Sequence, residues 1–123
     1  MPERVLIVGA SAAGLTAAEA LRRRGYDGAL TLIGAEPHPP YDRPPLSKQV
    51  LSGDWPPEKV LLRSEQDLGA LDADLLLGRP AVGLDPAARQ VRLAGGGSVD
   101  YDALLITTGA MPRRLRGADL AGV

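Results

Sequence analysis

The sequence has no cysteine and no phenylalanine, and its 123 residues include one tryptophan, three tyrosines and one histidine. Without cysteine the chain can form no structural disulfide, thiolate metal site, iron–sulfur cluster or thiol redox centre of its own. His38, the single histidine, has no Ser or metal-ligand cluster around it, so we expect a solvated loop residue and no metal site. With so few aromatic side chains, the core must consist mostly of Leu, Ala and Val, which allow backbones to approach closely.

An excess of charge is also missing, because 14 basic residues balance 15 acidic ones. A nucleic-acid-binding surface would need a basic stripe with interleaved aromatics, so we expect no nucleic-acid partner. An apolar fraction of 45% with little net charge predicts a globular domain. No run approaches the roughly 20 apolar residues of a membrane-spanning helix, so we expect no membrane partner and a cytoplasmic location. A signal peptide is the alternative interpretation of the apolar run 5–18, which Gly9 and Gly14 disfavour by interrupting it.

Hydrophobic patterning predicts an α/β fold that begins with a βαβ unit. The run 4–9 (RVLIVG) is apolar after its first residue, as in a parallel strand buried on both faces, and 29–34 (ALTLIG) repeats the pattern. Between them we expect a helix over 12–24, with cations in its last turn and Gly25 directly after it. The apolar face expected for this helix is made of Ala13, Ala17, Ala20 and Leu21.

The rest of the chain is predicted to alternate loops with short elements. Five prolines between residues 37 and 45 exclude a helix and an inner strand there and predict a stiff, extended connection. Short helices are expected at 46–51 and at 64–71, the second with Ser64 as its N-cap. A small antiparallel meander is expected from residue 74 onward, followed by a last buried strand at 103–107. Its strands are expected at 75–77, 81–84, 90–93 and 99–101.

A glycine motif, Gly9-Ala10-Ser11-Ala12-Ala13-Gly14, lies between the first predicted strand and the helix. This context makes a glycine pattern a candidate dinucleotide-binding motif. Gly9 permits the tight turn, Gly14 lets helix and strand pack closely, and the free N–H groups of the helix N-terminus attract a pyrophosphate. Ser11 replaces the middle glycine, and its hydroxyl can itself donate to a phosphate.

An acidic residue that binds a ribose hydroxyl is expected about 20 residues beyond such a motif. Here that residue is Glu36, one position later than Ala35, which directly follows the last glycine of the second strand. Two alternatives remain open at this point: the glycines can serve a purely structural turn, and Glu36 can be a solvated loop acid.

The run from Pro40 to Lys48 (PYDRPPLSK), with the glycine motif before it and Thr108-Gly109 after it, closely resembles the N-terminal FAD domain of the flavin-dependent ferredoxin reductases. These enzymes belong to the pyridine nucleotide-disulfide oxidoreductase superfamily and serve oxygenases, and the similarity covers nearly the whole chain. It implies a Rossmann-like FAD-binding fold with a parallel sheet and a small antiparallel meander. It also implies an oxidoreductase in which NAD(P)H reduces FAD and a ferredoxin-type iron–sulfur protein receives single electrons.

The same resemblance implies a set of residues that bind FAD. They are Gly9, Ala10, Ser11, Ala13, Gly14, Ala35, Glu36, Arg43, Lys48, Val82, Thr108 and Gly109. The first five would line the pyrophosphate, and the next two would meet the adenosine ribose. Arg43 would neutralise phosphate or brace the cofactor, and Lys48, the expected catalytic residue, would lie near the flavin ring. Val82 would contact the adenine edge, and Thr108 with Gly109 would match the family's segment at the end of the last strand, with Thr107 in place of its alanine.

The domain organisation follows from the single glycine motif, because the family uses a second βαβ unit for the nicotinamide cofactor. We expect residues 1–110 to form the N-terminal part of an FAD-binding domain and 111–123 to begin a linker toward an absent NAD-binding domain. The 123-residue chain alone is expected to be inactive. One alternative is an isolated flavin- or nucleotide-binding module without turnover of its own. Another is a dehydrogenase-type NAD-binding domain, which would not explain PYDRPPLSK. The lack of cysteine favours ferredoxin reductases over disulfide-using relatives.

Overall fold

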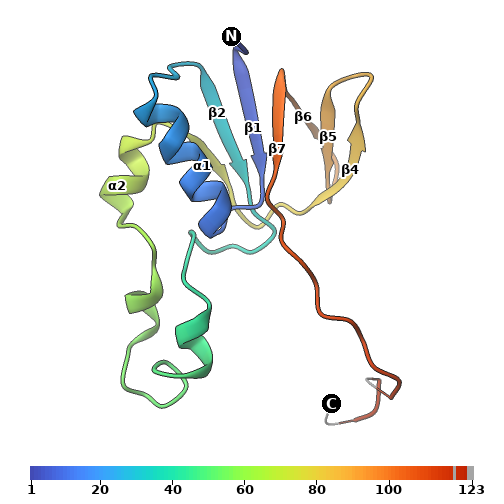
Figure 1. Ribbon diagram of the computed structural model, residues 1–123. Coiled ribbons are helices and arrows are strands. Elements are labelled where there is room, and N and C mark those ends of the chain that lie inside the picture. Colours follow the sequence, from blue (N-terminus) through green and yellow to red (C-terminus); the bar gives the residue numbers. More distant parts are fainter. Residues whose placement is uncertain (118, 122–123) are drawn as a thin grey trace.

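The computed structural model describes residues 1–117 and 119–121, and this part of the chain forms two sheets (Figure 1). The main sheet is parallel, with the strand order β3-β2-β1-β7, and the second is antiparallel, with the order β4-β5-β6. The main sheet consists of β1 (Arg4–Val8), β2 (Ala29–Ile33), β3 (Asp74–Leu76) and β7 (Ala103–Ile106). The second sheet consists of β4 (Ala81–Asp85), β5 (Gln90–Leu93) and β6 (Ser98–Asp100). The α/β class and the opening βαβ unit are therefore confirmed.

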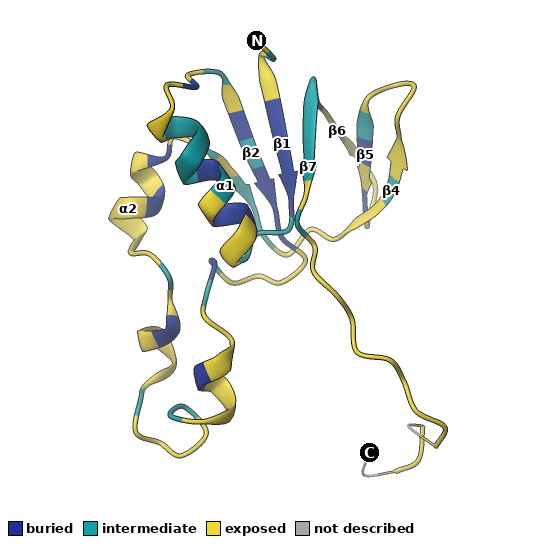
Figure 2. Cartoon of the chain, viewed as in Figure 1, coloured by how far each residue is buried: buried dark blue, intermediate teal, exposed yellow. Residues whose placement is uncertain are grey.

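Both faces of the main sheet are covered, which explains why its central strand is continuously apolar. Val5 and Ile7 point into a core shared with the helices α1 (Ala12–Arg23) and α2 (Glu65–Ala70). The alternate residues of β1, Leu6 and Val8, point into a core shared with β5. Successive side chains of a strand face opposite sides of the sheet, so two covered faces require an apolar residue at every position. Figure 2 shows this burial concentrated in β1 and β2.

The helix α1 begins and ends close to its predicted bounds, but its buried face differs from the expected one. The buried residues are Gly14, Leu15 and Ala18, whereas Ala13 is exposed. The expected face was therefore correct in part: Ala17 and Leu21 pack against the core, but the contact is centred on Gly14, Leu15 and Ala18. The helix instead turns toward the sheet at Gly14, where the backbones approach most closely.

A long excursion between β2 and α2 leaves the carboxyl ends of the strands and returns to the sheet (Figure 1). It contains two 3₁₀ helices, η1 (Pro44–Ser47) and η2 (Pro57–Val60). Its two limbs are tied by an isolated antiparallel bridge between Tyr41 and Leu61. The helix expected at 46–51 is replaced by η1 and following turns, because prolines at the first two positions of η1 start a helical turn two residues earlier.

Three other expectations are settled by the strand pairings and caps. The segment at 75–77 was wrongly assigned to the meander: β3 pairs in parallel with β2, so the meander has three strands. The last strand, β7, is only partly buried, and Ile106 is 65% exposed. The N-cap of α2 is confirmed, since the Ser64 hydroxyl accepts a hydrogen bond from the backbone N–H of Asp67 at 3.1 Å.

Within the described residues, neither α-helix has the length and apolar character needed to cross a bilayer. The segment expected to begin a linker, 111–123, has loops and turns where it is described. Ala118 and residues 122–123 of that segment lie outside the described residues.

Candidate functional site

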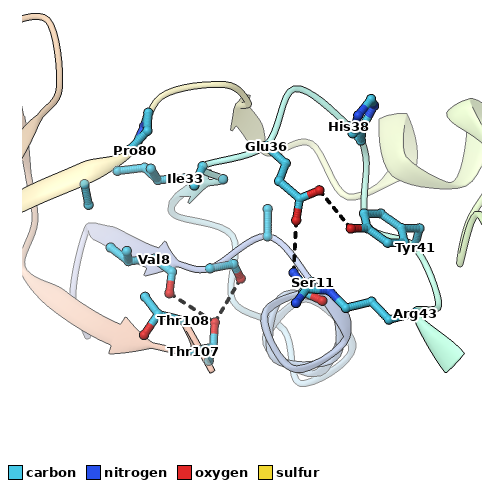
Figure 3. Close-up of a pocket in the computed structure, with 15 residues that line it drawn as sticks. Val8, Ser11, Ile33, Glu36, His38, Tyr41, Arg43, Pro80, Thr107 and Thr108 are labelled. Carbon is cyan, nitrogen blue, oxygen red and sulfur yellow. Dashed lines mark hydrogen bonds and ion pairs between the residues drawn. The ribbon is translucent and has the colours of Figure 1, made fainter. Parts of the chain in front are cut away.

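A pocket opens at the carboxyl ends of β1, β2 and β7, between the start of α1 and the loop that follows β2 (Figure 3). In open parallel sheets, ligands bind at this edge, outside the ends of strands. The lining residues are Val8, Gly9, Ala10, Ser11, Ile33, Gly34, Ala35, Glu36, His38, Tyr41, Arg43, Pro80, Ala81, Thr107 and Thr108. The pocket thus combines the glycine motif, the predicted ribose acid and part of the proline-rich run.

Gly9 and Gly14 are required by close backbone contacts at the turn from β1 into α1. Gly9 has φ +117°, a conformation that favours glycine, and a Cβ there would overlap the carbonyl oxygen of Thr107. A Cβ at Gly14 would overlap the carbonyl oxygen of Gly9. The two glycines therefore let the helix begin directly beside the strand end, as the motif predicts.

The N-terminus of α1 is suited to an anion. Ser11 is its N-cap residue and lines the pocket, yet its side chain makes no capping hydrogen bond. The first turn of the helix carries no acidic side chain, and the first N–H groups of any α-helix lack intrahelical partners. Free N–H groups together with the positive end of the helix dipole form a phosphate-binding site.

Thr107 lines the pocket and connects the end of β7 to the end of β1 through hydrogen bonds that the sequence did not predict. Its hydroxyl donates to the carbonyl oxygens of Gly9 at 2.9 Å and of Val8 at 3.2 Å (Figure 3). Its backbone N–H also donates to the Val8 carbonyl at 2.8 Å. These bonds fix the peptide groups at the end of β1, from which the glycine turn starts. The departure from the family's alanine at this position was the one sequence signal for it.

Glu36 is held by two neighbours from the same loop. The Tyr41 hydroxyl donates to Glu36 Oε2 at 2.8 Å, and Arg43 Nη2 donates to Glu36 Oε1 at 3.0 Å (Figure 3). The Glu36 side chain remains 46% exposed at the pocket. The hydrogen bond to Glu36, followed by burial, raises the pKa of Tyr41 above its ordinary value. Glu36 is therefore an exposed loop acid whose carboxylate two neighbours orient at the pocket.

The predicted cofactor residues fall into two groups in the structure. Those that line the pocket are Gly9, Ala10, Ser11, Ala35, Glu36, Arg43 and Thr108. Those that do not are Ala13, Gly14, Lys48, Val82 and Gly109. Lys48 is exposed beside η1, where its Nζ donates to the Pro44 carbonyl at 3.4 Å. Val82 is 64% exposed, although its neighbours Pro80 and Ala81 line the pocket.

Several residues that line the pocket were not predicted from the sequence as site residues. His38 is exposed as expected, but it also lines the pocket and contacts the Tyr41 ring edge-on, with 6.4 Å between ring centroids. Pro80 and Ala81 come from the far side of the pocket, just before and at the start of β4, and no local pattern in the sequence places them there. Among the described residues, no group of three or more His, Asp or Glu side chains could hold a metal ion.

The arrangement fits a dinucleotide. Gly9, Ala10 and Ser11 line the pocket at the start of α1 with small side chains or none, so a pyrophosphate can approach the backbone N–H groups there. Glu36 lies at the end of the neighbouring strand, where a carboxylate binds ribose hydroxyls in this class of fold.

Comparisons with known proteins agree with this interpretation. The family model for pyridine nucleotide-disulphide oxidoreductases matches residues 3–123. The biphenyl dioxygenase system ferredoxin–NAD(+) reductase component of Paraburkholderia xenovorans (strain LB400) is 46% identical over 125 residues, covering 100% of this chain and 30% of that protein. Rhodocoxin reductase of Rhodococcus erythropolis is 41% identical over 121 residues, covering 97% and 28%.

Solved structures give the same result for the fold. The covalent putidaredoxin reductase–putidaredoxin complex contains a chain that matches with a TM-score of 0.89 and 36% identity, covering 95% of this chain and 28% of that one. The crystal structure of Fdr9 matches with a TM-score of 0.78 and 48% identity, covering 92% and 28%. This chain therefore spans about 30% of the length of the relatives it matches.

Proposed function

Because the chain belongs to the pyridine nucleotide-disulphide oxidoreductase family, we propose that it forms the FAD-binding part of an NAD(P)H-dependent ferredoxin reductase. The observation that carries the proposal is the position of Glu36, held by Tyr41 and Arg43 at the end of β2, beside the open N-terminus of α1. A dinucleotide carries a pyrophosphate next to a ribose, and the groups that would bind these two parts line one pocket.

In the proposed complex the chain's own residues bind and orient the cofactor. The backbone of Gly9, Ala10 and Ser11 faces the pyrophosphate, and Gly14 keeps the start of α1 close to it, with Ala13 in the first helical turn. Glu36 receives the ribose hydroxyls next to Ala35. The cofactor itself would accept a hydride from NAD(P)H and release single electrons, which is the chemistry of a flavin.

The remaining predicted residues have proposed roles around this centre. Val82 would meet the adenine edge, next to the lining residues Pro80 and Ala81. Thr108 and Gly109 follow β7 at the carboxyl edge of the sheet, where the cofactor would pass. Lys48 is proposed as the catalytic residue, a cation that would lie near the flavin ring. Its position beside a proline-started 3₁₀ helix restricts the backbone that carries it.

The partner and the electron donor are proposed from relatives. One relative is named as a ferredoxin–NAD(+) reductase component of a dioxygenase system, and one solved structure is of a reductase joined to putidaredoxin. We infer a ferredoxin-type iron–sulfur protein as the electron acceptor of the whole protein, NAD(P)H as its donor and the cytoplasm, where that donor is available, as its location.

The test is the flavin content and the activity of the purified protein. A yellow protein with flavin-type absorption, released as FAD on denaturation, is the expected result. A colourless protein that binds NAD but not FAD would overturn the proposal. Turnover of NADH with a ferredoxin then separates a reductase from a flavin-binding module without activity; we expect none for the 123-residue chain alone.

A further inference from the structure

The orientation of the Glu36 carboxylate at the pocket depends on two side-chain contacts, of which the Tyr41 hydroxyl is one. The side chain is 46% exposed, so packing alone does not fix it. Arg43 contacts one carboxylate oxygen through a single nitrogen at 3.0 Å, which leaves the carboxylate free to turn about that contact. The Tyr41 hydroxyl contacts the other oxygen at 2.8 Å, so the two contacts together define the plane of the carboxylate.

The two residues that make this contact are anchored independently of it. The backbone carbonyl of Glu36 accepts a hydrogen bond from the Gly78 N–H at 2.8 Å. The backbone around Tyr41 is tied to the opposite limb of the excursion, since the Asp42 N–H donates to the Val60 carbonyl at 2.8 Å. Loss of the Tyr41 hydroxyl therefore frees the Glu36 side chain while the loop keeps its other anchors.

We propose that Tyr41 is a positioning residue for ribose recognition: its hydroxyl orients the Glu36 carboxylate so that the unused lone pairs face the hydroxyl groups of the ligand's ribose. This inference rests on the proposed function. A carboxylate has about four lone-pair sites, and Tyr41 with Arg43 occupies two of them, one on each oxygen. The sites that remain can accept from a ribose diol without reorganisation.

The chemistry of the phenol supports this role. The phenol has a single O–H donor, and it is directed at Glu36 Oε2 at 2.8 Å, so the hydroxyl acts on the carboxylate as a donor. Its ring is held from two sides, by His38 edge-on and by the Arg43 guanidinium, which lies 5.8 Å from the ring centroid. A phenylalanine keeps the ring in these contacts and removes only the hydroxyl.

The test is competition for flavin uptake in the flavin-stripped protein, with ADP and 2′,3′-dideoxy-ADP as probes. Both probes carry the adenine and the pyrophosphate, and only ADP carries the ribose hydroxyls. For Tyr41→Phe we expect the affinity for ADP to fall by about three- to tenfold, the value of one hydrogen bond to a partly exposed charged group. The affinity for 2′,3′-dideoxy-ADP should change by less than about twofold. The ratio of the affinity for ADP to the affinity for 2′,3′-dideoxy-ADP should therefore fall.

Tyr26→Phe is the matched control, because the Tyr26 hydroxyl donates to the Ala29 carbonyl at 2.9 Å, at the opposite end of β2 from the pocket. Tyr26→Phe should lower the thermal stability of the protein and leave the ratio of the ADP affinity to the 2′,3′-dideoxy-ADP affinity unchanged. The inference is overturned if Tyr41→Phe leaves the ratio unchanged, or if it weakens both probes equally, because the hydroxyl would then act on the loop rather than on the ribose site. If the unmodified protein takes up no FAD and binds neither probe, the proposed function itself fails.

Discussion

The closest backbone approach in the candidate site lies at Gly14, and a single methyl group placed there gives a measurable outcome. In Gly14→Ala the new Cβ overlaps the carbonyl oxygen of Gly9 and lies 3.1 Å from the Thr107 hydroxyl. The nearest atom belongs to the backbone, so no side chain can rotate away, and α1 must move from β1 by a distance on the order of 1 Å. Overpacking of this kind costs about 1–3 kcal/mol. The better helix propensity of alanine offsets about 1 kcal/mol of that.

Gly69→Ala separates these two effects. Gly69 lies in α2, is exposed, and has no atom near the position of a new Cβ, so this variant gains helix propensity without a clash. Its free energy of unfolding should rise by up to about 1 kcal/mol. Urea denaturation followed by circular dichroism should therefore separate the two variants by about 1–3 kcal/mol, and Gly14→Ala should also lose flavin. Equal stabilities, or unchanged flavin content in Gly14→Ala, would refute the assignment of Gly14 to the helix–strand contact beside the pyrophosphate.

Three further predictions concern contacts within the α/β framework: the first two lie at the end of the sheet opposite the pocket, and the third lies at the pocket. Arg22→Lys should lower the free energy of unfolding by about 2–3 kcal/mol in urea denaturation, because the guanidinium donates to four backbone carbonyls at 2.7–2.9 Å. Arg23→Lys, in the exposed last turn of the same helix, should change it by less than about 0.5 kcal/mol. Arg4 lowers the pKa of Asp102, chiefly through a hydrogen bond, so its stabilising effect is present above the unfolded-state pKa of about 3.9 and is lost as the pH falls through the lower folded-state pKa. Thermal melts of Asp102→Asn should accordingly show a lower Tm at neutral pH and a flatter acid dependence, and a parallel acid profile would contradict this. Thr107→Val should lose about 1 kcal/mol of stability by leaving a carbonyl at the end of β1 without its donor, whereas Thr107→Ser should retain most of it.

The sequence was sufficient for the elements whose patterns are local. The continuous apolar runs of β1 and β2 were identified because both faces of the sheet are covered, and the end of α1 was marked by cations and Gly25. The buried face of α1 was predicted only in part, with Ala17 and Leu21 correct and Ala13 exposed, because alanine gives almost no directional signal. The contact at Gly14, which the glycine motif itself requires, was the better guide to that face.

Other omissions arise from contacts that local sequence patterns do not encode. Nothing within 75–77 distinguishes a meander strand from a strand that pairs in parallel with β2. Pro80 and Ala81 reach the pocket because the chain turns there from the main sheet into the second one. The Tyr41 contact depends on a side-chain geometry within a proline-rich loop, for which hydrophobic periodicity carries no information.

The charges of the pocket explain how an anionic ligand can bind where cations are scarce. The Arg43 guanidinium is paired with Glu36 at 3.0 Å, so much of its charge is already offset. The attraction for a pyrophosphate must then come mainly from the start of α1, where the first turn has no acidic residue and Ser11 leaves its side chain uncommitted. A site made of backbone N–H groups works only if the ligand reaches the main chain, which requires positions with almost no side chain. In the proposed complex the glycines and alanines of the motif would thus act by their small size, and Glu36 would act by its charge and orientation. Substitutions of these glycines and alanines should therefore weaken binding of the whole dinucleotide. Substitutions of Glu36 and its neighbours should instead change the affinity for ligands that carry ribose hydroxyls relative to ligands that lack them.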